Sequence, residues 1–294
     1  DAVEQVRQKT QVPLVFLMSQ LLVIWGCRFV TDHIGEMFAK NKQANRKALI
    51  TFVTAGDPDI KTTEKLVLAM EQSGADLVEL GVPFSDPVAE GPVIQAANIR
   101  ALSNGLKIDG IFDAVEQVRQ KTQVPLVFLM YINSIFNYGK DRFFKRCREA
   151  GVDGVIIPDL PYEEKDEVAT QAKENGIKLI SLVAPTSHAR IKKIAAQAEG
   201  FLYCVSSLGV TGTRSNFQTD FSAFFSLIDQ YTAAPTALGF GISTPEQAHE
   251  LKKYADAIIV GSAIVRLVGA AHSADEAVKK VGTFTASLRA GLDR

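Results

Sequence analysis

Cysteine and histidine are scarce in this sequence, with three cysteines and four histidines among 294 residues. Cys27, Cys147 and Cys204 lie far apart and form no CxxC pair, and the histidines are scattered. No metal-ligand spacing results, so we expect no metal site. A cysteine count this low suits a reducing compartment rather than a disulfide-stapled secreted domain, and we predict a cytoplasmic protein.

The sequence also lacks an excess of charge of either sign. Lys and Arg number 32 against 33 for Asp and Glu, which gives a formal net charge of −1. A nucleic-acid-binding protein needs a basic excess to neutralise phosphates, so nucleic acid is excluded as a partner. Hydrophobic residues make up 47% and charged residues 22%, as in globular enzymes with a sizeable core. That apolar content excludes a disordered chain.

One segment occurs twice, because residues 1–18 are identical to residues 113–130. Nothing recurs a third time, so the copy is not the period of a repeat protein. The apolar run 12–27 is similar to the core of a signal peptide, but half of it duplicates the internal segment and it is short for a membrane span. We therefore expect residues 1–32 to be an appended segment outside the fold, with no membrane as partner.

From about His33 the chain alternates short apolar runs with helical stretches. Apolar runs of this kind are typical of parallel strands that are buried on both faces. The expected strands cover residues 48–56, 76–84, 124–131, 154–159, 178–185, 200–207, 235–243 and 256–265. Eight strand–helix units predict an α/β fold of the (β/α)8 TIM-barrel class, with one catalytic domain over residues 33–294. The GxGxxG fingerprint of an open dinucleotide-binding sheet is absent after the first strand.

Carboxylates gather at the end of the second expected strand, where a barrel of this class places its chemistry. Glu79 stands among apolar residues of that strand, and burying its carboxylate is costly unless it has a task or a partner. Asp86 and Glu90 follow in the next loop. Carboxylates in different environments can divide acid and base work between them. The alternative is that these are ordinary surface carboxylates, as is common for loops.

Glycines mark the ends of the last three expected strands, at 209–212, 239–241 and 261–262. Small residues there let backbone N–H groups approach an anion, and helix N-termini help to bind it. The loops after the seventh and eighth strands are the usual phosphate site of such barrels. The alternative is that strand–helix turns need glycine in any case. The residues alone therefore predict a phosphorylated small-molecule ligand with carboxylates across the pocket.

The stretch VELGVPFSDPVAEGPVIQAAN closely resembles the signature of the tryptophan synthase α-subunit family. The similarity continues through FVTAGDPD, GVTGTR, GFGISTPEQ and IVGSAIV, and it spans about residues 33–292. It implies a lyase of tryptophan biosynthesis that cleaves indole-3-glycerol phosphate to indole and glyceraldehyde 3-phosphate. It also implies no cofactor in this chain and a partner, the tryptophan synthase β subunit, which carries pyridoxal phosphate (PLP) in an α2β2 heterotetramer.

The resemblance also assigns residues to roles. Glu79 matches the catalytic glutamate of the family, and Glu90 stands where most members carry a second catalytic carboxylate as Asp. The residues expected to line the pocket or to bind the substrate phosphate are Phe52, Tyr131, Tyr203, Thr211, Gly212, Phe240, Gly241, Gly261 and Ser262. Two alternatives stay open: a free-standing lyase that works without a β subunit, and a non-catalytic chain that serves only as a folding scaffold or activates its partner.

Overall fold

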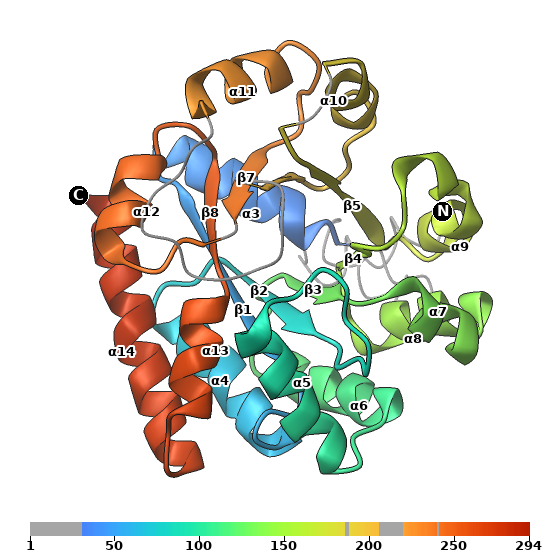
Figure 1. Cartoon of the computed structure of the whole chain (residues 1–294), viewed down its shortest axis with the longest axis vertical. Coiled ribbons are helices and arrows are strands. Elements are labelled where there is room, and N and C mark those ends of the chain that lie inside the picture. The colour runs from blue at the N-terminus through green and yellow to red at the C-terminus, as the bar shows by residue number, and fades with distance from the viewer. Residues whose placement is uncertain (1–30, 186–187, 206–219, 240) are drawn as a thin grey trace, which may run out of the picture. The chain divides into compact units, whose positions relative to one another are not determined.

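Eight parallel strands form the centre of the molecule in the computed structural model, which describes residues 31–185, 188–205, 220–239 and 241–294 (Figure 1). The strands pair in sequence order, and the first pairs with the last, so the sheet closes into a barrel. The strands are β1 Ala48–Thr54, β2 Leu77–Gly81, β3 Leu126–Leu129, β4 Gly154–Ile156, β5 Lys178–Val183, β6 Leu202–Val205, β7 Thr236–Gly239 and β8 Ala257–Val260. The predicted (β/α)8 barrel is therefore confirmed, and each strand lies within its predicted range.

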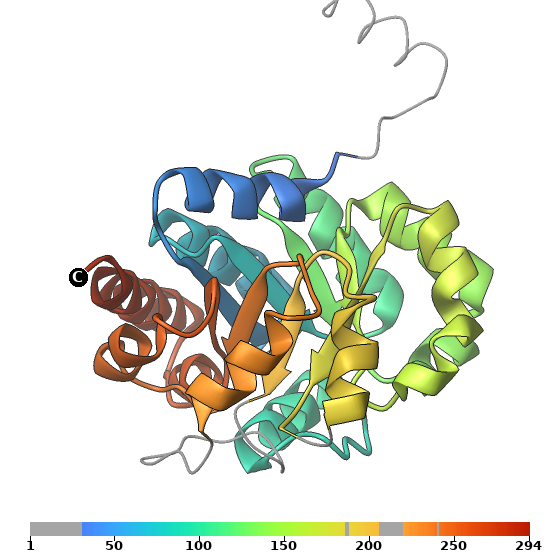
Figure 2. The same cartoon turned by 90° about the horizontal axis from the view of Figure 1, so that it is seen from above.

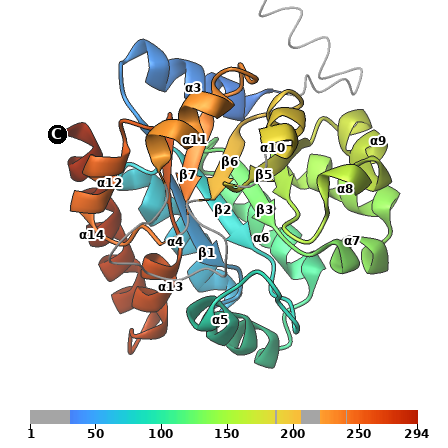
Figure 3. The same ribbon diagram turned by 45° about the horizontal axis from the view of Figure 1, so that its top comes forward.

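Helices surround the barrel on its outer side (Figures 1 and 3). They are α3 His33–Gln43, α4 Ile60–Gln72, α5 Pro92–Ser103, α6 Ile108–Arg119, α7 Ile132–Tyr138, α8 Lys140–Ala150, α9 Asp166–Glu174, α10 His188–Ala195, α11 Phe221–Ile228, α12 Pro245–Leu251, α13 Ser262–Gly269 and α14 Ala274–Asp293. A short 3-10 helix covers Tyr162–Glu164. Within these described ranges, no helix has the length and apolar character that a membrane crossing requires.

The structure differs from the sequence-based prediction at the end of the eighth strand and at two helices. The eighth strand was predicted to continue to residue 265, but it ends at Val260, and residues 262–265 begin α13 instead. Apolar runs of this length fit a buried strand and a buried helix equally well, which explains the error. Neither α3 nor α7 was predicted. The apolar side of α3 packs on the inner core and covers the N-terminal end of the barrel (Figure 2).

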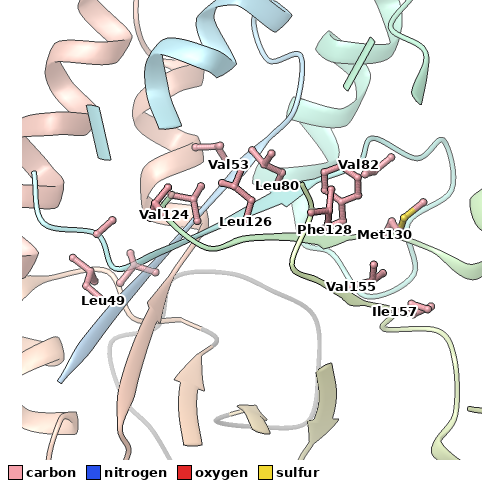
Figure 4. Close-up of a cluster of buried hydrophobic side chains, with 14 of the residues drawn as sticks. Leu49, Val53, Leu80, Val82, Val124, Leu126, Phe128, Met130, Val155 and Ile157 are labelled. Atoms are coloured by element: carbon pink, nitrogen blue, oxygen red, sulfur yellow. The ribbon is translucent and has the colours of Figure 1, made fainter. Parts of the chain in front are cut away.

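Apolar side chains fill both faces of the sheet. Leu49, Val53, Leu80, Leu126 and Phe128 point away from the barrel axis and pack under the surrounding helices (Figure 4). The alternate residues of the strands fill the interior, which contains Ile50, Leu77, Val127, Ile156, Ile180, Ala237 and Ile259. Because both faces are buried, a charged residue within a strand must have a specific environment.

Three aspartates clasp the starts of neighbouring strands at the N-terminal end of the barrel. Each carboxylate accepts a hydrogen bond from a backbone N–H of the preceding strand, at 2.8, 2.7 and 2.9 Å. The backbone N–H of each aspartate donates in return to the carbonyl of the same partner residue. The three pairs are Asp76 with Leu49, Asp153 with Leu126, and Asp256 with Thr236. This end is therefore held rigidly, and the opposite end of the barrel is left for chemistry.

Candidate active site

A pocket lies at the C-terminal end of the barrel, where the second strand and the loop after it place two carboxyl groups. Glu79 of β2 lies beside Phe52 of β1 in the strand register, and Glu90 directly precedes Gly91, the N-cap residue of α5. The pocket is lined by Phe52, Glu79, Ala89, Glu90, Ile94, Leu129, Pro158, Leu182, Tyr203, Gly241, Ile259, Gly261 and Ser262. It combines an apolar wall with two carboxyl groups and a glycine-rich side.

Glu79 is buried in the pocket wall with 1% of its surface exposed. Loss of hydration on burial raises the pKa of its carboxyl group to about 8. Its Oε1 atom is buried without a hydrogen-bond partner among the described residues. Because the pKa lies above 7, this carboxyl group is mainly protonated at neutral pH. It can therefore give a proton to a substrate and take one back.

Glu90 has a different environment, although it is also largely buried. Burial raises the pKa of its carboxyl group to about 7, and a hydrogen bond from Asn98 acts in the opposite direction. The Asn98 Nδ2 atom donates to Oε2 of Glu90 at 2.7 Å. The positive end of the α5 helix dipole also lies next to this residue and favours a negative charge. Glu90 is therefore ionised at a lower pH than Glu79, and the two carboxyl groups can have different roles.

Two aromatic rings of the pocket pack against strand glycines. A Cβ atom on Gly81 would lie 2.5 Å from Cζ of Phe52, and one on Gly239 would lie 2.7 Å from the hydroxyl of Tyr203. Neither glycine can gain a side chain without moving the ring. Burial, and the nearby Glu79 carboxylate, raise the pKa of Tyr203 well above its ordinary value, so this hydroxyl stays neutral.

The side of the pocket near β7 and β8 is made of small residues. Gly241 has a φ angle of +96°, a conformation that favours glycine. Gly261 caps the N-terminus of α13, and Ser262 is the first residue of that helix. The first N–H groups of a helix have no acceptor within the helix and point outward, so this side can bind an anion. Within the described part of the chain, no group of three or more His, Cys, Asp or Glu side chains could hold a metal ion.

Comparison with known proteins identifies the family. The family model for the tryptophan synthase alpha chain matches residues 38–292. The chain belongs to this family. The tryptophan synthase alpha chain of Thermoanaerobacter sp. (strain X514) is 50% identical over 258 residues, which cover 88% of this chain and 98% of the relative. Tryptophan synthase alpha chains are lyases that cleave indole-3-glycerol phosphate, and this is the activity of the present member.

Solved structures of the tryptophan synthase alpha chain family have the same fold. Tryptophan synthase subunit alpha from Legionella pneumophila str. Paris matches with a TM-score of 0.81 at 36% identity, covering 90% of this chain and 99% of that chain. A chain of the tryptophan synthase complex from Pyrococcus furiosus matches with a TM-score of 0.75 at 34% identity, covering 83% and 98%. The agreement extends over the whole barrel.

The structure brings most of the residues expected from the family resemblance into this pocket. The exception among the described residues is Tyr131, which is not among the residues that line the pocket. Its ring stacks on Phe84 with centroids 4.9 Å apart. The backbone N–H of Ala89 donates to its hydroxyl at 3.0 Å, so Tyr131 braces the loop that carries Glu90. Burial raises the pKa of Tyr131 to about 12. Thr211, Gly212 and Phe240 lie outside the described residues.

The sequence analysis missed several residues of the site in this tryptophan synthase family member. The apolar wall includes Leu129, Leu182 and Ile259, which were not predicted as pocket residues. Their place on the strands could have identified them, because each lies towards the end of a strand and faces the barrel interior. Asn98 was also missed, because nothing in the sequence links a helical Asn to a carboxylate eight residues earlier.

Proposed function

We propose that this chain cleaves indole-3-glycerol phosphate by a retro-aldol reaction in which Glu79 is the general acid and base. The observation that supports this most directly is the burial of Glu79 at the active end of the barrel, with its pKa raised to about 8 and one carboxyl oxygen unpaired. Such a group is protonated when the substrate binds. It is also not committed to a structural hydrogen bond through that oxygen.

The proton transfers follow from the chemistry of the bond that breaks. Carbon 3 of indole is a poor leaving carbanion, so the ring must first take a proton at that carbon. Protonated Glu79 supplies this proton, and its carboxylate then removes the proton of the hydroxyl on the adjacent glycerol carbon. The electrons of the C–C bond return to the ring and give indole. The hydroxyl carbon becomes the aldehyde of glyceraldehyde 3-phosphate, and Glu79 is protonated again.

We assign Glu90 the task of stabilising the ring nitrogen during this step. Protonation at carbon 3 places positive charge on the ring N–H, and a carboxylate next to it lowers the barrier. The Asn98 hydrogen bond and the start of α5 both favour the charged form of Glu90. The aromatic side chain of Phe52 and the apolar wall provide the surface for the indole ring.

We propose that the substrate phosphate binds at the opposite side, against Gly241, Gly261 and Ser262. Open N–H groups at the start of α13 and the absence of bulky side chains support this position. By resemblance, Gly212 adds to the phosphate site, Phe240 to the indole site, and Thr211 to the residues that line the pocket. Fixing the phosphate would hold the reacting carbons next to Glu79, which gives the rate advantage of pre-orientation.

The proposed partner is a tryptophan synthase β subunit in an α2β2 complex. Large apolar side chains are exposed on the loop that carries Glu90 and on the helices after β2 and β3: Val88 is 73% exposed, Ile99 and Leu102 of α5 are 65% and 37% exposed, and Phe136 of α7 is 45% exposed. Exposed apolar residues that cluster in this way mark protein interfaces. The acid–base work assigned to Glu79 needs no cofactor in this chain, and PLP would belong to the β subunit.

We further propose that residues 1–32 are an appended segment and that residues 33–294 are the catalytic domain. The internal copy of the duplicated sequence, residues 113–130, already provides the second half of α6 and the whole of β3 in the closed barrel. A closed barrel has no free edge for another strand. The few cysteines support a cytoplasmic location.

Indole release by the purified chain tests the assigned roles. We expect Glu79→Gln to lower turnover by about 10²- to 10⁴-fold, as for removal of a general acid–base group. Glu90→Ala should lose about 10²- to 10³-fold, whereas Glu90→Asp keeps the anion and should stay active. Glu174→Gln, at the exposed end of α9, is the matched control. Equal rates for the two Glu90 variants would contradict its role.

The same assay separates the alternatives. A free-standing lyase would release indole at the same rate with and without a tryptophan synthase β subunit, whereas an α subunit should be accelerated. A chain that only activates its partner would release no indole under either condition, although it would raise the β reaction.

A further inference from the structure

Helix α5 contacts Glu90 at two points. The side-chain amide of Gln95 donates to the backbone carbonyl of Glu90 at 2.7 Å. The side-chain amide of Asn98 donates to the carboxylate at the same distance. Asn98 is buried with 3% of its surface exposed, whereas Gln95 lies on the exposed side of the helix. The buried contact therefore holds the group that is assigned to the reaction, and the exposed contact holds its backbone.

The helix itself is anchored by an ion pair two residues after Asn98. Arg100 donates to both carboxylate oxygens of Asp57, from Nε at 2.8 Å and from Nη2 at 2.7 Å. Asp57 is almost fully buried, and the guanidinium binds it at two points, which fixes both distance and orientation. The rotation of α5 is therefore fixed, and with it the direction of the Asn98 amide.

We propose that Asn98 is the positioning residue for Glu90: its buried amide fixes the orientation of the carboxylate and stabilises its charged form opposite the substrate ring nitrogen. This inference rests on the role proposed for Glu90 in cleavage. A carboxylate that is free to rotate in an apolar pocket would take up a proton or turn away from the ring. A fixed amide donor prevents both, because it donates only to the oxygen that faces it.

No cation replaces Asn98 in this task among the described residues. Arg100 of the same helix is engaged by Asp57, and no described Lys or Arg forms an ion pair with Glu90. Of the neighbouring elements, β2 presents Glu79, and the segment after β3 presents neutral Tyr131. Helix α13 carries Arg266, whose side chain is exposed. The other carboxyl group that lines the pocket is Glu79, which is mainly protonated at neutral pH and supplies no positive charge to Glu90.

Substitution of Asn98 should be visible as a shift in the titration of Glu90. The carboxyl signal of Glu90 can be followed by carbon-13 NMR in the full chain and identified by its loss in Glu90→Gln. In Asn98→Leu the donor is gone, so we expect the pKa of Glu90 to rise by about one unit. Asn98→Asp has nearly the same shape and adds a like charge, so its shift should be larger. Gln95→Ala, which loses only the backbone contact, should leave the pKa of Glu90 in place.

The rate of indole release should follow the same shift. Glu90 must be ionised, so the rising limb of the plot of kcat against pH should move to higher pH by the same amount in Asn98→Leu. The falling limb, where Glu79 loses the proton that it must donate, should stay near pH 8, and the maximal rate should therefore drop. In a Glu90→Ala background, Asn98→Leu should cause no further loss, because Asn98 acts only through Glu90.

Two results would overturn the proposal: an unchanged pKa of Glu90 in both Asn98 variants, or a full additional loss of rate in the Glu90→Ala background. A wild-type chain that releases no indole would instead contradict the proposed function, and the NMR titration would still decide the contact between Asn98 and Glu90.

Discussion

Replacing Glu79 by Gln should slow cleavage and make the fold more stable at neutral pH, and the gain in stability should grow as the pH rises. A buried carboxyl group with a raised pKa is more easily ionised in the unfolded chain than in the fold. Between the two pKa values the folded chain therefore holds a proton that the unfolded chain has lost. Stability is lost as the pH rises through this window, and a Gln side chain, which does not titrate, removes the loss.

The size of the effect follows from the pKa of Glu79. Its ordinary value of 4.5 is raised to about 8 in the fold. One pKa unit corresponds to about 1.4 kcal/mol, so the loss of unfolding free energy reaches about 5 kcal/mol above pH 8. Between pH 5 and pH 8 the difference between variant and wild type should grow by about 3 kcal/mol. Burying the Gln amide costs about 1–3 kcal/mol, but this cost does not depend on pH.

Urea unfolding at several pH values between 5 and 8 measures this directly. The free energy of unfolding should fall more steeply with pH for the wild type than for Glu79→Gln. Glu174→Gln is the control for the loss of one exposed carboxylate, and its curve should run parallel to that of the wild type. If the wild-type and Glu79→Gln curves are parallel over this range, Glu79 is not a buried, protonated group, and its assignment as the general acid is wrong.

Three further outcomes are expected. Gly239→Ala places a Cβ atom 2.7 Å from the hydroxyl of Tyr203, so it should displace the ring and raise KM for the substrate about tenfold. The control, Gly110→Ala on α6, should leave KM unchanged. Arg100→Lys loses the two-point ion pair with Asp57 and should lower the free energy of unfolding by about 2 kcal/mol in urea titrations. An unchanged midpoint of urea unfolding would show that Arg100 does not anchor α5. Deletion of residues 1–30 should leave the circular dichroism spectrum and indole release intact, and a truncated chain that does not fold would show that the first copy is structural.

The fold was predictable because its strands are apolar on both faces. Runs such as 48–56 and 178–185 stand out against the polar helices between them, and their number and order lead directly to a closed barrel. The ends of elements were less predictable, as the eighth strand shows. Helix α3 escaped prediction although Ile34, Met37 and Phe38 have helical spacing, because its remaining residues are polar and it precedes the first strand.

The site was predictable only where a residue conflicts with its surroundings. A carboxylate inside an apolar strand identified Glu79, and glycines at strand ends identified one side of the pocket. Leu129 and Leu182 gave no such signal, because an apolar strand residue has the same appearance whether it faces the helices or the pocket. Asn98 depends on how α5 turns over the pocket, which sequence periodicity does not determine.

The three aspartate clasps join six of the eight strands into pairs. Each clasp joins an odd-numbered strand to the even-numbered strand that follows it: β1 to β2, β3 to β4, and β7 to β8. The pair β5–β6 has Phe201 in the equivalent position and no such clasp. None of the three clasps joins β4 to β5 either. A circular permutation that opens the chain between those strands would cut none of the three clasps, so each clasped pair of strands would stay on one continuous stretch of chain.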